Sequence, residues 1–92
     1  MNSLELKIYN ADKVPHLNVV RTLFRAYESS VSDLACFQRF DEEMASLPGD
    51  YTPPIGCLLL AEYAGTAAGC IALRKYDHGI AEVKRLFVYP EF

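Results

Sequence analysis

The sequence predicts an α+β domain in which two helices pack against a mostly antiparallel sheet of about four strands. Three observations support this class: one alternating segment near the N-terminus, two segments with helical spacing of apolar residues, and three strand-like runs that follow them. Strands that follow a pair of helices are typical of α+β folds. We expect residues 1–92 to form a single domain, because the longest loop-like segment covers only residues 48–56.

The first strand and the first helix are predicted from the N-terminal third. Residues 4–8 alternate between apolar and polar side chains, which is the pattern of a half-buried strand. Residues 10–12 offer a helix N-cap, and Pro15 falls in the first helical turn, where its missing N–H costs nothing. The apolar residues of this helix are spaced by three and four and share one face: Leu17, Val20, Phe24, Tyr27 and Val31.

A second, shorter helix is predicted to start within residues 29–33, where serine and aspartate side chains compete for the backbone and can cap a new helix. Its outer face is acidic, and residues 48–49, Pro-Gly, end it. The apolar residues again step by three and four: Phe37, Phe40, Met44 and Leu47.

Three strands are predicted in the C-terminal third. The runs 57–63 and 67–75 have strand composition and are joined by the tight turn 64–66, so they form a hairpin. Residues 77–79 make a second turn into the run 80–88, and Tyr89-Pro90 ends that strand.

Composition excludes several classes of function. A net charge of -3 with mixed signs gives no field that would attract nucleic acid or anionic lipid. The longest apolar run, residues 57–61, is far shorter than the roughly 20 residues of a membrane span. The cysteines Cys36, Cys57 and Cys70 form no CxxC pair and have no histidine at metal-ligand spacing, so we expect no metal and a cytoplasmic location.

The segment Glu82–Phe92, EVKRLFVYPEF, resembles the fourth strand of GNAT acetyltransferases. The turn at Gly65 with the run 69–73 resembles the hairpin of the second and third strands of that family, and residues 36–43 resemble the second helix of one bacterial subgroup. The resemblance covers nearly the whole chain. It implies the N-terminal half of a GNAT fold and an acetyl-CoA-dependent N-acetyltransferase that acts on a small-molecule amine or a protein amino group.

The resemblance also implies a site on the predicted fourth strand. Leu86, Phe87 and Val88 would present backbone groups to the pantetheine and thioester of acetyl-CoA beside a bulge, and Glu82 would be the general base. Two plainer interpretations remain: the three apolar residues are simply buried, and the carboxylate is paired across the sheet with Lys84, Arg74 or Lys75.

The sequence stops at Phe92, before the loop that binds the cofactor pyrophosphate in this family, and none of its five glycines forms Gly-x-Gly before a helix. We therefore expect a truncated domain with impaired acyl transfer. The free edge of the fourth strand suggests a homo-oligomer, such as a dimer, or a separate chain that covers it. The alternative function is a non-catalytic GNAT-like module for oligomerisation or partner binding, and a ligand-binding domain unrelated to acyl transfer is a third hypothesis.

Overall fold

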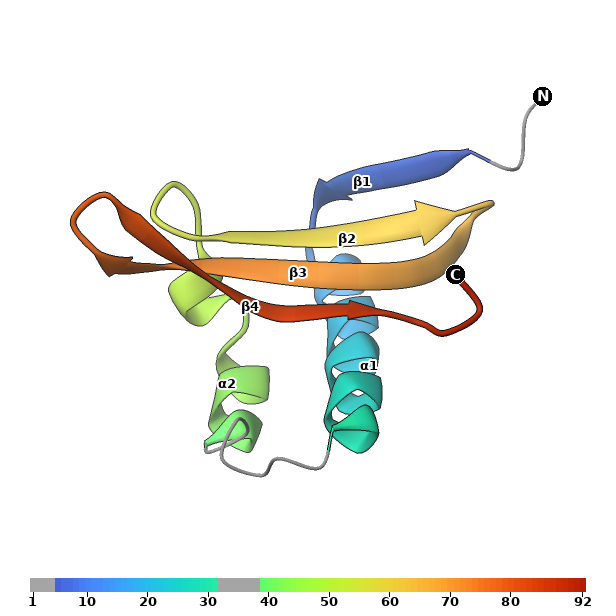
Figure 1. Cartoon of the computed structure of the whole chain (residues 1–92), viewed down its shortest axis with the longest axis horizontal. Helices are drawn as coiled ribbons and strands as arrows, with labels where there is room; N and C mark the ends of the chain where they lie inside the picture. The colour runs from blue at the N-terminus through green and yellow to red at the C-terminus, as the bar shows by residue number, and fades with distance from the viewer. Residues whose placement is uncertain (1–4, 32–38) are drawn as a thin grey trace.

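The structure, a computed structural model, describes residues 5–31 and 39–92. Four strands form one antiparallel sheet in the order β1-β2-β3-β4, and both helices lie on one of its faces (Figure 1). The α+β class and the two helices between the first and second strands are thereby confirmed. The elements in chain order are β1 Leu6–Asn10, α1 Val14–Ser30, α2 Phe40–Ser46, the short 3-10 helix η2 Gly49–Tyr51, β2 Cys57–Tyr63, β3 Thr66–Asp77 and β4 Ile80–Val88.

The first strand lies two residues later than its pattern predicted, although Leu4 itself is outside the described residues. Pairing with β2 continues beyond β1, because the backbone N–H of Ala11 donates to the carbonyl of Leu58 at 2.8 Å. The segment that was predicted as an N-cap therefore still belongs to the sheet, and Lys13 takes the cap position without a side-chain hydrogen bond. Pro15 lies in the first helical turn, as predicted.

The core lies between the sheet and the two helices. Most of the predicted face of α1 is buried, with Leu17, Val20 and Phe24 at most 7% exposed and Leu23 beside them. Each such side chain contributes about 1.5–3 kcal/mol when it leaves water. Tyr27 and Val31 are only partly buried, and Val31 is the C-cap rather than part of the helix. Phe24 stacks on Phe40 of α2 with ring centroids 6.1 Å apart, which joins the two helices. The strands complete the core with Leu58, Leu60, Cys70 and Ala72.

The predicted break between the helices at residues 29–33 begins too early, because α1 continues through Ser29 and Ser30 to its C-cap Val31. The second helix is described only from Phe40, and the predicted core residue Phe37 lies outside the described residues. It ends before Pro48, as predicted. The following loop contains an element that the sequence did not indicate, because η2 brings Tyr51 into the core at 3% exposure.

The hairpin of β2 and β3 turns at two residues with positive φ, Ala64 at 54° and Gly65 at 81°, which suits the right-handed twist of the strands. A second irregularity lies between β3 and β4. Cys70 pairs with Phe87 but Ala72 pairs with Lys84, so two residues of β4 lie opposite one residue of β3. This is a β-bulge, which bends the strand and redirects its side chains.

In the described ranges, no helix has both the length and the apolar character that crossing a bilayer requires.

Candidate functional site on strand β4

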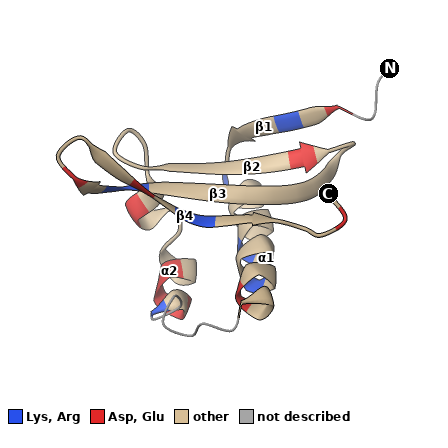
Figure 2. Cartoon of the chain, in the orientation of Figure 1, with Lys and Arg blue, Asp and Glu red and all other residues tan. Residues whose placement is uncertain are grey.

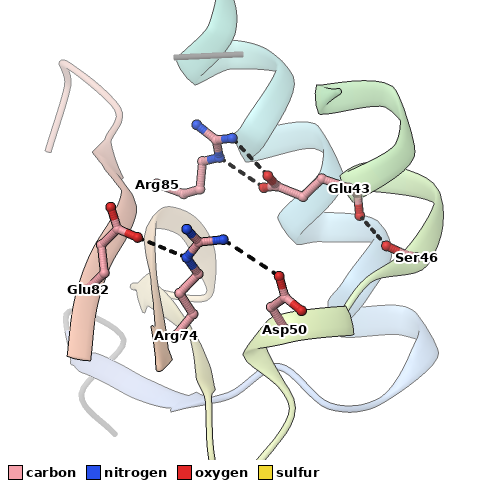
Figure 3. Close-up of polar contacts among 6 residues, drawn as sticks. All are labelled: Glu43, Ser46, Asp50, Arg74, Glu82 and Arg85. Carbon is pink, nitrogen blue, oxygen red and sulfur yellow. Dashed lines mark hydrogen bonds and ion pairs between the residues drawn. The ribbon is translucent and has the colours of Figure 1, made fainter. Parts of the chain in front are cut away.

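The proposed general base, Glu82, lies on β4 directly opposite Arg74 of β3. The Nε of Arg74 donates to Oε1 of Glu82 at 2.8 Å (Figure 3). Among the cross-strand partners that the sequence allowed, the structure selects Arg74. Both side chains are more than one third exposed, so this pair contributes at most about 1 kcal/mol to stability. A role of Glu82 in proton transfer stays a prediction.

The three residues that were expected to bind the cofactor do not share one environment. Phe87 faces the helices, where its ring lies 5.8 Å from the ring of Tyr27. Leu86 and Val88 are 58% and 52% exposed. The interpretation that all three are simply buried strand residues is therefore wrong for Leu86 and Val88, although Phe87 packs against the core.

The backbone of β4 is accessible along its outer edge. The N–H of Tyr89 donates to the carbonyl of Ala68 at 2.9 Å, so this residue points towards β3. Because successive residues of a strand direct their backbone groups to opposite sides, the N–H and C=O of Val88 point away from the sheet. In the part of the chain that the structure describes, β4 is the last strand of the sheet and no strand pairs with this edge.

The bulge places Arg85 in an unusual conformation, with φ at 58°, and turns its side chain towards α2. There its Nε and Nη2 donate to the two carboxylate oxygens of Glu43 at 2.9 and 2.8 Å (Figure 3). The guanidinium carbon also lies 5.0 Å from the ring centroid of Phe40. Arg85 is only 5% exposed, so this ion pair is part of the core.

The ion pair determines the proton affinities around it. Burial by itself raises the pKa of Glu43, but the hydrogen bonds and charge of Arg85, a hydrogen bond from Tyr51 and the charge of Lys84 together hold the pKa below its ordinary value. Burial, together with the charge of Glu43, raises the pKa of Tyr51 far above that of a free phenol. Sequence reasoning missed this cluster, because the acidic run of α2 was interpreted as a solvated outer face.

A pocket of about 480 Å³ lies between α2, η2 and the helix-facing side of β3 and β4. The six residues drawn in Figure 3 surround this region, and five of them line the pocket. Figure 2 shows the contrast with the rest of the sheet, because the middle segments of β2 and β3 carry no charged residues whereas β4 carries a basic segment beside α2. The lining is therefore mainly polar and charged: Glu42, Glu43, Ser46, Asp50, Arg74, Lys84 and Arg85, with Arg39 at the rim.

The histidines and cysteines form no comparable cluster. His16 packs edge-on against the ring of Tyr9, with centroids 4.8 Å apart. Cys70 is buried, and burial raises the pKa of its thiol to about 12, which makes it a poor nucleophile. Within residues 5–31 and 39–92, no group of three His, Cys, Asp or Glu side chains could hold a metal ion.

Comparisons with known proteins agree on one kind of protein. No protein-family model matches the chain. An uncharacterized N-acetyltransferase of Schizosaccharomyces pombe is 36% identical over 85 residues, which are 89% of this chain and 52% of that protein. An uncharacterized N-acetyltransferase of Dictyostelium discoideum is 39% identical over 66 residues, 71% of this chain and 31% of that protein. The chain therefore spans about half the length, or less, of these curated relatives.

A solved structure gives the same result for the fold. An acetyltransferase from Streptococcus agalactiae superposes with a TM-score of 0.65 and 21% sequence identity, over 94% of this chain and 53% of that one. At this low sequence identity, the superposition supports a shared fold and nothing further. The chain is therefore N-acetyltransferase-like in sequence, and its fold corresponds to about half of an acetyltransferase fold.

Proposed function

We propose that this chain contributes the acyl-donor edge and part of the acceptor pocket of an acetyl-CoA-dependent N-acetyltransferase. The observation that carries the proposal is the outer edge of β4, where Val88 directs its backbone N–H and C=O away from the sheet just after a bulge. An extended group with amides, such as the pantetheine of acetyl-CoA, needs unpaired backbone donors and acceptors of this kind. The names of the relatives support the same reaction.

Acetyl-CoA supplies an activated acyl group, and the residues of this chain bind and orient it. In this proposal Leu86 and Val88 hold the pantetheine through outward backbone groups, while Phe87, whose backbone groups face β3, anchors the strand by packing on Tyr27. The acceptor is a small-molecule amine or a protein amino group that approaches from the pocket beside Arg85.

Glu82 accepts the proton of the amine in this proposal. It precedes Leu86 by four residues, roughly 13 Å along a strand at ~3.3 Å per residue, so the proton travels through intervening water. Arg74 holds the carboxylate in place. We assign the reaction to the cytoplasm, where the free thiols of Cys57 and Cys70 remain reduced.

The test combines cofactor binding with transfer. Acetyl-CoA, titrated to millimolar concentrations, is expected to raise the melting temperature of the chain in a saturable way. Acetyl transfer to a panel of amines is then compared between the wild type, Glu82→Gln and the control Glu62→Gln on β2. We expect Glu82→Gln to lower turnover by about 10²–10⁴ without changing the melting shift. Unchanged turnover in Glu82→Gln would contradict the role of Glu82 as proton acceptor. The absence of any melting shift would contradict binding of acetyl-CoA at the edge of β4.

A second function is favoured by a separate observation. The sheet face opposite the helices exposes large apolar side chains on both outer strands, among them Leu6, Ile8, Leu86 and Val88. We propose a second copy of the chain as the partner that covers β4, which is the alternative of an oligomerising module. Analytical ultracentrifugation is expected to show a dimer that Val88→Lys dissociates, because a charge on an edge strand opposes pairing. A monomer at high micromolar concentration contradicts this alternative.

A further inference from the structure

The pocket beside Arg85 contains cationic groups that the described residues do not fully pair. In a regular strand, successive side chains point to opposite faces. At the bulge of β4, by contrast, both Lys84 and Arg85 line the same pocket, because the extra residue changes the alternation. Arg74 of β3 adds a third cation from the neighbouring strand.

These three cations differ in how they are paired. Arg85 donates two hydrogen bonds from its guanidinium to Glu43 and is buried as part of the core. Arg74 uses only its Nε for Glu82, and its Nη1 lies 3.7 Å from Oδ2 of Asp50, which is too long for a hydrogen bond. Asp50 has a side chain that is 78% exposed, so this contact is loose.

Lys84 is half-buried and forms no hydrogen bond or ion pair within the ranges 5–31 and 39–92. The charge of Lys84 helps to lower the pKa of Glu43, but no described carboxylate of the pocket accepts a hydrogen bond from Lys84. Both oxygens of Glu43 accept from Arg85, and Glu42 lies 3.6 Å from Arg39 at the exposed rim. The pocket therefore offers donors, the Nη groups of Arg74 and the Nζ of Lys84, for which the described part of the chain provides no hydrogen-bond acceptor.

We propose that this pocket binds the carboxylate of the acceptor, so that the acceptor is a small amino acid-like molecule that carries both an amine and a carboxylate. The planar guanidinium fork of Arg74 fits two carboxylate oxygens, and Lys84 adds a point charge. This inference rests on the proposed function, because the amine of such a molecule then extends past Arg85 towards the residues 86–88 of β4.

The charge of the lining favours a carboxylate over a phosphate. The lining carries four cationic and three anionic side chains, a net charge of +1, so one carboxylate neutralises it whereas a doubly charged phosphate leaves an excess of negative charge. A single carboxylate replaces the loose contact of Asp50 with Arg74 and leaves the Glu43 ion pair intact.

The experiment measures binding without acetyl-CoA, so its failure is distinguishable from failure of the proposed acyl transfer. L-phenylalanine and 2-phenylethylamine differ only in the carboxylate, and inorganic phosphate is the third probe. Binding is followed by the NMR signals of the Arg74 side-chain Nε–H and the Lys84 amide. The variants are Lys84→Gln and Arg74→Lys, with Lys75→Gln as the matched control, because Lys75 is exposed on β3 and does not line this pocket.

We expect saturable shifts with L-phenylalanine and none with 2-phenylethylamine. Lys84→Gln is expected to weaken the affinity for L-phenylalanine about tenfold, which is the typical effect of losing a hydrogen bond to a charged group, and Arg74→Lys weakens it by loss of the fork. Lys75→Gln binds like the wild type. Equal binding of the two amines, tighter binding of phosphate than of L-phenylalanine, or full affinity in Lys84→Gln would each overturn the inference.

Discussion

The buried ion pair of Glu43 and Arg85 permits a quantitative prediction. Glu43→Gln keeps the shape of the side chain but removes its charge, so the guanidinium of Arg85 remains 5% exposed beside a neutral amide. Breaking a buried pair by removing one partner costs about 3–5 kcal/mol. The side chain of Glu43 keeps 20% exposure, so we expect the lower end of this range, about 3 kcal/mol.

This loss is large for a small domain. A chain of 92 residues is expected to have about 5–14 kcal/mol of stability. With an m-value of about 1.2 kcal/mol/M in urea, Glu43→Gln lowers the midpoint of unfolding by roughly 2.5 M. The measurement is equilibrium unfolding in urea, followed by circular dichroism at neutral pH.

Glu42→Gln is the matched control, since the neighbouring carboxylate is 73% exposed and lies 3.6 Å from Arg39. Such a surface pair contributes about 0–1 kcal/mol, so the control remains close to the wild type. The double variant Glu43→Met with Arg85→Met is expected to regain part of the lost stability, because neither charge is then buried. If Glu43→Gln lies within 0.5 kcal/mol of Glu42→Gln, the assignment of Arg85 to the core is refuted.

The pH dependence gives a second test of the same pair. The pKa of Glu43 is lower in the folded chain than in the unfolded chain, so its stabilising effect is present above the unfolded value of about 4.3 and is lost as pH falls through the folded pKa. The wild type therefore loses its advantage over Glu43→Gln in acid. A stability difference that is constant from pH 7 to pH 2 contradicts the lowered pKa.

The remaining predictions concern single residues. Tyr51→Phe lowers the free energy of unfolding by about 1 kcal/mol at neutral pH, because the hydroxyl and its hydrogen bond are lost. The pKa of Tyr51 is raised in the folded state, so the wild type loses stability as the pH rises above 10. Urea unfolding at alkaline pH is expected to show a smaller loss for the variant. Gly69→Ala lowers the free energy of unfolding by about 1–3 kcal/mol, since the added Cβ would lie 2.5 Å from the carbonyl oxygen of Phe87. In Gly79→Ala the added Cβ has no atom within 4 Å, so this control is destabilised only by backbone strain at a φ of 70°. Cys70 is alkylated by iodoacetamide only on unfolding, as peptide mass mapping can show; rapid labelling in the folded chain would contradict its burial.

The fold was largely predictable because it depends on periodic patterns. The spacing of Leu17, Val20 and Phe24 predicted the buried face of α1, and the apolar runs with turns at Gly65 and Gly79 predicted the meander of β2, β3 and β4. The boundaries were less predictable. β1 extends to Asn10 because the neighbouring strand offers a carbonyl to Ala11, which is a tertiary effect that no local pattern contains.

The candidate site was predictable only in part. The position of Glu82 opposite a cation was one of the open interpretations, because cross-strand pairs follow from register. The exposure of Leu86 and Val88 and the burial of Arg85 were not predictable. All three depend on a one-residue bulge, and a bulge changes which residue faces which side without changing the composition of the strand.

The most direct test of the central claim is an NMR map of acetyl-CoA binding to the ¹⁵N-labelled chain. Residues 86–88 of β4 are compared with residues 6–8 of β1, because both segments lie on the outer strands of the same sheet. The proposed donor edge predicts saturable amide shifts concentrated at residues 86–88 and none at residues 6–8. Shifts of equal size on both strands, or no saturable shift at millimolar acetyl-CoA, would contradict it.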